Sequence, residues 1–341
     1  MLSVDPEDMT LEGKLEDDTL RELRAICTAG WDPNFVASPE GLYASDTVAF
    51  RRHDATVRRI IPWLAKNVDF PTSNIIDFGA GCGSSALAMS KVARFVRSFE
   101  IHGTSCSAFR RRMEIFGVNN VELTECPPET IFQRAVEAID DETHVVLVAV
   151  VEHLLEQEQV SYLRAFWDAL APGKTLSILE TPNYLAYFDT HTFKQPFAHF
   201  VRDEHFEDWV RNSPSSLRFR DGLLEVFERQ GTQSALERRR RLGLGVTAEP
   251  FQQAFGCDLN EIVVADGFDE EMLKWFPLSF DDKILLATFR HYGVELPIGF
   301  AKNVLSFTFK KPVNEEEARQ NKLRNATRRT GLCDALAPQI D

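Results

Sequence analysis

The chain lacks the features that would place it at once among metal-ribbon, disulfide-rich or membrane proteins. Its six cysteines include no CxxC pair, so neither a zinc ribbon nor a disulfide framework is predicted. No apolar run is long enough to span a bilayer, and the first residues are acidic, without the basic and apolar regions of a secretory leader. We therefore expect a reducing, cytoplasmic setting.

An excess of positive charge is also missing. Lys and Arg number 38 against 52 Asp and Glu, which gives a formal net charge of -14. Binding to nucleic-acid phosphates requires clustered Lys and Arg, so we expect no nucleic-acid partner. Four consecutive arginines at 238–241 are the exception, and a solvated helix face is favoured over a phosphate-binding patch there.

A glycine-rich segment at 74–90 is the most informative motif. Its first residues are apolar and β-branched, as in a short buried strand, and a helix is predicted to begin at Ser84. Between the two lie Gly79, Gly81 and Gly83. Glycines at such positions allow a sharp turn and the close approach of a ligand, so the segment is predicted to be a nucleotide-cofactor loop.

The spacing of the glycines distinguishes between cofactors. A dinucleotide fingerprint, G-x-G-x-x-G, would place its third glycine where this chain has Ser84. The chain has G-x-G-x-G instead, which disfavours a nicotinamide-dependent oxidoreductase. A second predicted strand at 95–100 ends in Glu100, about twenty residues past the loop, where an acid can accept hydrogen bonds from both ribose hydroxyls.

With Asp77 two residues before the first glycine, the loop resembles motif I of the class I S-adenosylmethionine-dependent methyltransferases. The apolar run that begins at Thr143 and continues to Leu155 resembles the family's fourth-strand segment. A helix, Leu170-Ala-Pro-Gly-Lys174 and a further strand follow in the family's order. The resemblance implies an α/β fold with a Rossmann-like, seven-stranded, mostly parallel sheet flanked by helices. It also implies S-adenosyl-L-methionine as cofactor and S-adenosyl-L-homocysteine as product.

The resemblance also implies a set of cofactor-binding residues along three strand ends. The chain departs from the family's pattern at the residues expected to recognise adenine. Relatives place an acid or amide just after the third strand, where this chain offers Glu125 and the backbone around Cys126. The full predicted set is Asp77, Gly79, Ala80, Gly81, Gly83, Glu100, Ile101, Glu125, Cys126, Ala149 and Val150.

We expect five segments. They are an N-terminal extension or lid (1–50), a cofactor-binding core (51–183), a helical cap over the substrate (184–257), the end of the core sheet (258–312) and a tail of frayed helix and coil (313–341). In the extension, a helix with an apolar face at 15–27 offers a dimer surface, and a loop is expected at 31–43. The aromatic residues of that loop, Trp31, Phe35 and Tyr43, either close over a pocket or pack on the core.

The segment Glu180-Thr-Pro-Asn183, followed by Asp189-x-His191-Thr, resembles one bacterial and fungal subgroup of these methyltransferases. It is rich in aromatic and polar residues, as a substrate pocket would be. The predicted substrate-binding residues are Glu152, Tyr184, Tyr187 and His199, and the predicted catalytic residues are His191, His153 and Asp189.

The catalytic prediction follows from the chemistry of a hydroxyl acceptor, which needs a general base with a pKa near the working pH. His191 is preferred, with His153 beside Glu152 as the alternative. A purely structural role is equally open for His153 and for the pair Asp189 and His191. Asp189, His191 and His199 also form a two-His, one-carboxylate set, but from sequence alone we assign no metal.

The function predicted is methyl transfer to a small molecule, with a hydroxyl as the expected acceptor, by in-line displacement in which alignment supplies much of the acceleration. A monomer or homodimer without a membrane partner is expected. The alternative is a protein of the same fold that binds the cofactor but acts as a lyase, a cyclase or a binding module.

Overall fold

The structure is a computed structural model that describes residues 5–336. The described strands are β1 (Asn74–Phe78), β2 (Phe95–Glu100), β3 (Val121–Glu125), β4 (Thr143–Val148), β5 (Thr175–Pro182), β6 (Val263–Asp266) and β7 (Val304–Lys310).

Helices precede, alternate with and follow these strands. The α-helices are α1 (Pro6–Met9), α2 (Asp17–Cys27), α3 (Pro33–Ala37), α4 (Pro39–Asp46), α5 (Arg52–Ala55), α6 (Ile61–Leu64), α7 (Ser84–Ser90), α8 (Gly103–Ile115), α9 (Pro128–Glu137), α10 (Glu156–Ala169), α11 (Asp203–Asn212), α12 (Arg220–Gln230), α13 (Thr232–Arg241), α14 (Glu249–Phe255), α15 (Leu259–Ile262), α16 (Glu270–Leu273), α17 (Phe280–Tyr292) and α18 (Glu315–Leu336). Two π-helical turns, η1 (Thr47–Arg51) and η2 (Thr56–Ile60), and four 3₁₀ turns, η3 (Phe70–Thr72), η4 (Val151–His153), η5 (Ala198–Phe200) and η6 (Ile298–Ala301), complete the list.

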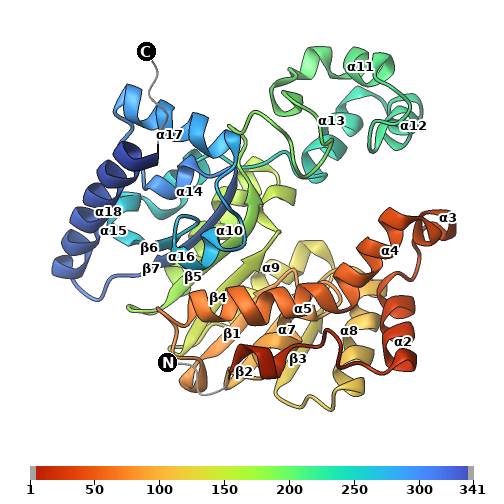
Figure 1. Cartoon of the computed structure of the whole chain (residues 1–341), viewed down its shortest axis with the longest axis horizontal. Coiled ribbons are helices and arrows are strands. Elements are labelled where there is room, and N and C mark those ends of the chain that lie inside the picture. Colours follow the sequence, from red (N-terminus) through yellow and green to blue (C-terminus); the bar gives the residue numbers. More distant parts are fainter. Residues whose placement is uncertain (1–4, 337–341) are drawn as a thin grey trace. The chain divides into compact units, whose positions relative to one another are not determined.

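The strands form one seven-stranded sheet in the order β3-β2-β1-β4-β5-β7-β6. β1 pairs in parallel with β2 and with β4, β2 pairs in parallel with β3, and β6 pairs antiparallel with β7 (Figure 1). The predicted α/β class and its seven-stranded sheet are thereby confirmed. The order reverses between β1 and β4, and ligands of open α/β sheets bind at the carboxyl ends of strands at such a switch point.

Two compact units make up the chain. The first contains residues 1–148 and 169–177, and the second contains residues 149–168 and 178–341. Strand β5 is divided, because its first three residues belong to the first unit and the remainder to the second.

In the first unit, a continuous helical segment from Pro39 to Leu64 precedes β1, interrupted only in its hydrogen-bond pattern by the two π-helical turns. Its apolar stripe, predicted for a helix at 48–67, is buried: Val57, Ile60, Ile61, Trp63 and Leu64. Helix α2 packs on α8, where Arg111 contacts Glu22 at 2.6 Å. Leu23 and Cys27 of α2 are buried within this unit, whereas Leu15, Leu20 and Ile26 of the face predicted as a dimer surface are half-buried.

The expectation of a loop at 31–43 was wrong, because α3 and α4 occupy it. Asp32 and Ser38 are N-caps whose side chains accept the backbone N–H of Asn34 and Gly41, and each is followed by a proline at the first helical position. An N-cap followed by proline is a helix-start signal. Phe35 and Tyr43 remain 39% and 63% exposed, so neither packs on the core.

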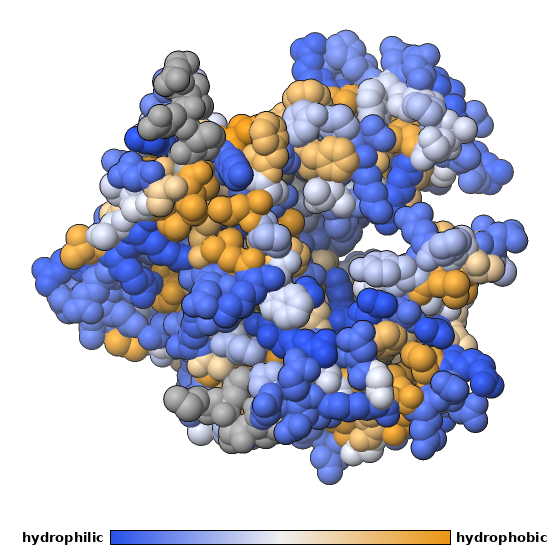
Figure 2. Space-filling view, viewed as in Figure 1, coloured by the Kyte–Doolittle hydropathy of each residue, from blue (hydrophilic) through white to orange (hydrophobic). Residues whose placement is uncertain are grey.

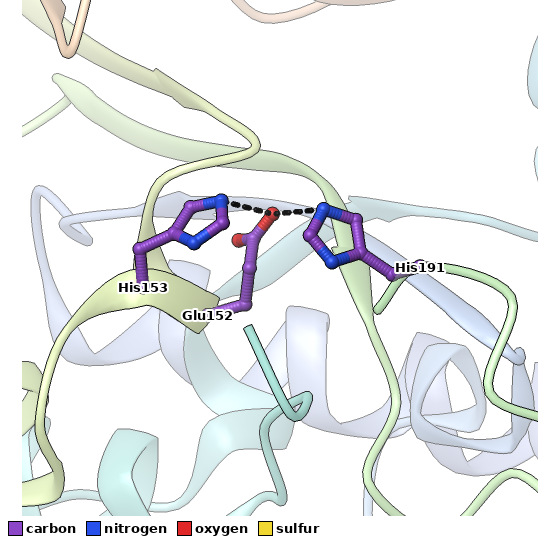
Figure 3. A group of neighbouring side chains, drawn as sticks. All are labelled: Glu152, His153 and His191. Carbon is purple, nitrogen blue, oxygen red and sulfur yellow. Dashed lines mark ion pairs between the residues drawn. The ribbon is translucent and has the colours of Figure 1, made fainter. Parts of the chain in front are cut away.

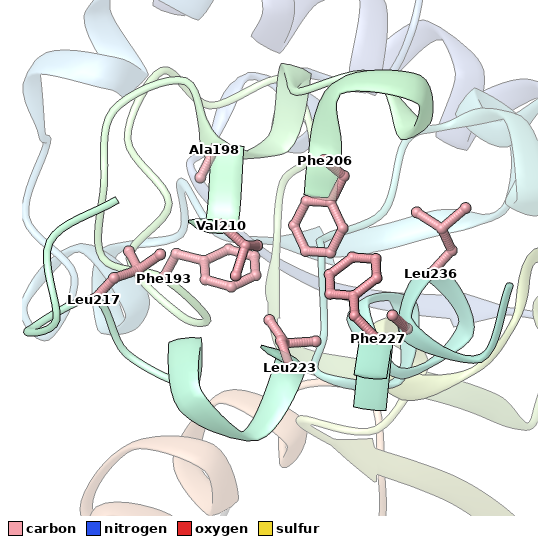
Figure 4. Close-up of a cluster of buried hydrophobic side chains, with 9 residues drawn as sticks. Phe193, Ala198, Phe206, Val210, Leu217, Leu223, Phe227 and Leu236 are labelled. Atoms are coloured by element: carbon pink, nitrogen blue, oxygen red, sulfur yellow. The ribbon is translucent and has the colours of Figure 1, made fainter. Parts of the chain in front are cut away.

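In the second unit, α11, α12 and α13 surround their own apolar cluster (Figure 4). Phe206 and Phe227 lie at its centre with ring centroids 6.0 Å apart. These helices cover the three helical segments predicted for 184–257. The last helix of that range, α14, packs on the sheet and not in this cluster. Its Phe251 stacks on Phe309 of β7, with ring centroids 5.5 Å apart.

Two further boundaries differ from the sequence prediction. The strand expected from Glu261 starts at Val263, because Asp258 caps the short helix α15 through the N–H of Asn260. The tail, expected to fray, contains the 22-residue helix α18. Its Asn325 donates to the carbonyls of Asn260 and Val263, which fixes the helix. The end of the predicted coil, 337–341, lies outside the described residues.

The face shown in Figure 2 is largely hydrophilic, with apolar groups scattered among charged ones. Among the described helices, none combines the length and the apolar character needed to cross a membrane.

Candidate functional site

The glycine loop follows β1 and turns through left-handed backbone. Gly79, Gly81 and Gly83 have φ of +77°, +54° and +80°, a region that residues with a Cβ enter only at a cost. A Cβ on Gly83 would lie 2.7 Å from the ring of Phe109, whereas a Cβ on Gly81 would meet nothing within 4 Å. Gly83 is therefore required by packing inside the protein, and Gly81 borders open space.

Asp77 supplies an unsatisfied acceptor beside that space. Its side chain is 2% exposed, and its Oδ2 has no hydrogen-bond partner among the described residues. Burial, followed by the negative charge of Glu100, raises the pKa of Asp77 to about 7, which Arg52 partly opposes. A buried carboxylate without a partner is costly, and a cationic ligand group would relieve that cost.

The carboxylate of Glu100, at the end of β2, is hydrogen-bonded to the glycine loop. Its Oε2 accepts the N–H of Gly81 at 2.7 Å, and its Oε1 accepts those of Ile101 and His102 at 2.8 and 2.9 Å. A carboxylate offers about four acceptor positions, so one remains for a ligand hydroxyl. Because three backbone donors depend on it, Glu100 also fixes the loop's shape, a role that the sequence did not reveal.

A cavity of about 240 Å³ lies at the switch point, at the ends of β1 and β4. It is lined by the loop, by Val148, and by residues of the N-terminal segment, in all Cys27, Trp31, Val48, Arg52, Asp77, Gly79, Ala80, Gly81, Cys82, Ser84, Ser85, Ser105 and Val148. Trp31 thus lies at the cavity rather than in the core. Of the predicted cofactor residues in this unit, Gly83, Glu100, Ile101, Glu125 and Cys126 lie outside this lining.

Glu125 is engaged in a partly exposed ion pair. Its Oε2 lies 2.7 Å from Arg110, and the side chain is 39% exposed. Ala149 and Val150 belong to the second unit, where the backbone of Ala149 is left-handed (φ +54°) and its N–H donates to Leu179.

The cavity wall also contains a thiol that sequence reasoning missed. Arg112, fully buried, donates to the carbonyls of Ala49 and Val48 and to Cys27 Sγ at 2.9 Å. The Cys82 thiol and the Arg112 charge outweigh burial and lower the pKa of Cys27 to about 6. A thiolate is therefore favoured at Cys27.

The second unit brings three predicted residues together (Figure 3). Glu152 and His153 come from η4, directly after β4, and His191 comes from the segment after β5. Glu152 Oε1 lies 3.9 Å from His153 Nε2 and 4.0 Å from His191 Nε2. The carboxylate is fully buried, while the two rings are 41% and 33% exposed.

The backbone after α13 packs directly against this group. A Cβ on Gly243 would lie 2.9 Å from the ring of His191 and 3.1 Å from Cγ of Glu152. The arginine run also contributes and is only in part the predicted solvated face, because Arg238 and Arg240 are exposed whereas Arg239 is buried and Arg241 is half-buried. Arg241 pairs with Glu158 and its carbonyl contacts His153 Nδ1 at 2.9 Å, while Arg239 is buried on the ring of Phe206.

Asp189 and His199 hold the loop that carries His191. Asp189 accepts the backbone N–H groups of His191, Thr192 and Phe193 at 2.8 to 2.9 Å, and its Oδ1 lies 3.3 Å from His199 Nε2. Burial opposes ionisation, but these contacts keep the pKa of Asp189 below its usual range. Asp189 therefore holds the backbone of the loop at His191. None of these three hydrogen bonds joins Asp189 to the His191 ring.

A second cavity, of about 570 Å³, lies in the same unit. Its lining includes Glu152, Tyr184, Phe200, Arg239 and Arg240, so two of the four predicted substrate-binding residues border it. Tyr187 packs instead on Phe197 at 4.8 Å, and His199 is buried under Tyr184 at 5.7 Å. Aromatic and charged groups together suit a polar molecule with an apolar part.

Comparisons with known proteins give a limited result. No model of a protein family matches the chain, and no curated protein matches it. Similar solved structures include precorrin-6y C5,15-methyltransferase from Geobacter metallireducens (19% identity, 36% of this chain and 60% of that chain, TM-score 0.29). They also include the CcbJ methyltransferase from Streptomyces caelestis (17% identity, 40% and 53%, TM-score 0.32) and a putative methyltransferase from Streptococcus mutans in complex with SAH (14% identity, 45% and 80%, TM-score 0.30).

The chain thus spans 60% of the precorrin enzyme and 53% of the CcbJ enzyme. Likenesses of this extent do not identify an activity. The function is therefore argued from the two sites themselves.

Proposed function

We propose that the chain is an S-adenosylmethionine-dependent methyltransferase that transfers a methyl group to a small-molecule hydroxyl. The supporting observation is the buried Oδ2 of Asp77, which has no hydrogen-bond partner among the described residues, beside a loop of left-handed glycines at the sheet's switch point. S-adenosylmethionine carries an ammonium group that suits Asp77 and a ribose, one hydroxyl of which suits the single remaining acceptor position of Glu100.

The residues of the first unit fit this cofactor in kind. Asp77, Gly79, Ala80 and Gly81 line the cavity, and the space at Gly81 permits close approach of a ligand. At about 240 Å³ the cavity is smaller than the roughly 300–1,000 Å³ usual for ligand sites. We infer that the N-terminal segment, whose Trp31 and Cys27 line the cavity, yields when the cofactor enters.

The acceptor is assigned to the second unit, at the cavity bordered by Glu152 and Tyr184. His191 or His153 is the general base of this hypothesis, with Nε2 as the atom that takes the proton. Asp189 serves as the positioning residue, because it accepts the N–H of His191.

Calorimetry with S-adenosylhomocysteine tests the cofactor assignment. We expect micromolar binding to the wild type and at least tenfold weaker binding to Asp77→Asn, since the variant cannot pair with an ammonium group. Asp141→Asn, an exposed change in the same unit, is the matched control. Binding of NADH in place of S-adenosylhomocysteine, or equal affinity in the two variants, would refute the assignment.

Transfer itself is measured with S-adenosylmethionine labelled in the methyl group and a panel of hydroxylated acceptors. Label in an acceptor supports the proposal. Tight cofactor binding without transfer to any acceptor class would favour the alternative of a lyase, a cyclase or a binding module on this fold.

A further inference from the structure

The cluster of Glu152, His153 and His191 has a proton arrangement that its hydrogen bonds determine. His153 Nδ1 lies 2.9 Å from the carbonyl oxygen of Arg241. A carbonyl oxygen only accepts, so Nδ1 carries the proton. In the neutral ring, Nε2 then presents a lone pair, and it faces Glu152.

The same holds for His191 through an intermediate hydroxyl. Thr192 Oγ1 donates to the carbonyls of Leu242 and Gly243, so its single proton is committed. Toward His191 Nδ1, 3.2 Å away, the hydroxyl oxygen can only accept. Nδ1 of His191 is therefore protonated as well, and its Nε2 lone pair also faces Glu152.

Three electron-pair donors consequently converge, since the two Nε2 atoms and a carboxylate oxygen all lie within 4.8 Å of one another. Neither lone pair can donate a hydrogen bond to the carboxylate. The neutral imidazole is the form of histidine that binds metals.

We propose that Glu152, His153 and His191 form a binding site for a divalent first-row transition-metal ion. Two imidazoles and one carboxylate are a ligand set that leaves coordination positions open for water or an acceptor. The outer hydrogen bonds from Nδ1 to a carbonyl and to a hydroxyl are the kind that orient metal-binding histidines. This ligand set replaces the one considered from sequence, because Asp189 and His199 are committed to holding the loop.

The distances between the ligand atoms are close to those that a bound ion requires. Around a tetrahedral ion with bonds of about 2.0–2.2 Å, neighbouring ligand atoms lie roughly 3.4 Å apart. The observed 3.9 and 4.0 Å separations require each ring to approach Glu152 by about half an ångström. Both rings are partly exposed, which allows that rotation and gives an ion access.

The consequence for catalysis rests on the proposed function. A hydroxyl bound to a divalent ion loses its proton more readily than a free one. The lone pairs of His153 and His191 cannot serve as ligands and as the general base at the same time. The ion would instead lower the pKa of the acceptor hydroxyl, and the hydroxyl proton would pass to solvent water.

The test is metal binding by the whole chain without cofactor. After treatment with EDTA and its removal, we expect calorimetry to give one Zn²⁺ per chain, and Co²⁺ to give a visible ligand-field absorption band. His153→Ala and His191→Ala should each weaken Zn²⁺ binding at least ~100-fold and abolish the Co²⁺ band. His205→Ala, an exposed histidine of α11, is the matched control and should bind as the wild type does.

Thr192→Val adds a readout that simple ligand loss does not give. It removes no ligand atom but leaves His191 Nδ1–H without its acceptor, and should weaken Zn²⁺ binding about 10- to 100-fold. Circular dichroism and thermal unfolding establish that each variant is folded. No Zn²⁺ binding by the wild type, or Zn²⁺ binding by His153→Ala and His191→Ala as tight as that of the wild type, would overturn the site.

Failure of this proposal is distinguishable from failure of the proposed function. S-adenosylhomocysteine binding is measured separately in EDTA. Its persistence without Zn²⁺ binding rejects the metal site alone, whereas Zn²⁺ binding without cofactor binding rejects the methyltransferase assignment and leaves the metal site in place.

Discussion

At the scale of single residues, Asp77 couples the stability of the fold to pH. The folded chain holds the Asp77 proton more tightly than the unfolded chain, because burial raises the pKa from 3.8 to about 7. The stability from this proton is present below about pH 4 and is lost as the pH rises through about 7. Asp77→Asn cannot ionise and should raise the free energy of unfolding by up to about 4 kcal/mol at pH 8.5, at 1.4 kcal/mol per pKa unit.

Urea denaturation at pH 5 and at pH 8.5 measures this effect. At pH 5 the gain should shrink to about 1.6 kcal/mol, because Asp77 is protonated in the folded chain but already ionised in the unfolded chain. Asp141→Asn should show no such dependence. If Asp77→Asn destabilised the fold at pH 8.5, the raised pKa of Asp77 would be contradicted. If it stabilised the fold and weakened cofactor binding, Asp77 would lower stability for the sake of binding.

Cys27 is a second residue whose reactivity follows from its neighbours. With its pKa lowered to about 6 by Cys82 and Arg112, its alkylation by iodoacetamide should reach half its maximal rate near pH 6. S-adenosylhomocysteine should slow the reaction, because Cys27 lines the cavity. Peptide mapping by mass spectrometry measures both.

Cys257 is the internal control for that experiment. Cys257 is exposed as a residue. Burial of its sulfur atom, followed by the negative charges of Glu261 and Asp258, nevertheless raises the pKa of its thiol to about 11. Its alkylation should therefore keep rising well above pH 8. A Cys27 rate that also rose above pH 8 would show that Arg112 does not stabilise the thiolate.

At the scale of elements, the glycine loop contains one glycine that internal packing requires, Gly83, and one that we expect ligand binding to require, Gly81. Gly83→Ala adds a Cβ 2.7 Å from Phe109 and should cost about 2–4 kcal/mol of stability, as strained backbone and overpacking add. Gly81→Ala should cost only about 1–2 kcal/mol for its backbone, yet abolish S-adenosylhomocysteine binding. Thermal unfolding and calorimetry on both variants decide this, and equal destabilisation by the two would refute it.

The carboxylate of Asp54 holds the N-terminal segment, together with Arg58, which pairs with Glu7 and Glu12. Asp54 accepts the N–H groups of Leu11 and Glu12 at 2.7 and 2.8 Å and pairs with His53. Asp54→Ala should release residues 10–14, so that limited proteolysis there accelerates at least tenfold at an overall cost of roughly 2–3 kcal/mol. Asp18→Ala, which removes only an exposed pair with Arg21, is the control, and equal cleavage of the two would count against the fastening.

Elements were predictable from sequence where one local signal dominates. The apolar runs of β1 and β4 and the stripe at Val57 to Leu64 gave strands and helix as observed. Composition misled at 31–43, where Pro, Gly and Asn indicate a loop, although the two prolines follow the N-caps Asp32 and Ser38 and begin helices. Helix α18 was underestimated because its fixing contacts, such as Asn325 to Asn260, join residues far apart in sequence.

At the scale of the whole molecule, the sequence indicated which residues carry chemistry better than it indicated how they are grouped. Glu152 beside His153 was visible as a neighbouring pair, and His191 was a separate candidate. Their convergence depends on the backbone at Gly243 and Arg241, some ninety residues beyond His153. No local pattern records such a contact, so the metal ligand set considered from sequence, Asp189, His191 and His199, differs from the set that we propose.

The division of β5 between the two units has a consequence for synthesis on the ribosome. The first unit needs residues 169–177 for completion, and the chain that emerges before them, 149–168, belongs to the second unit. At a synthesis rate of about 5–20 residues per second, roughly two to six seconds pass between the emergence of β4 and that of β5, its neighbour in the sheet. During that interval a nascent chain presents an unpaired apolar edge, which is the kind of surface that chaperones recognise.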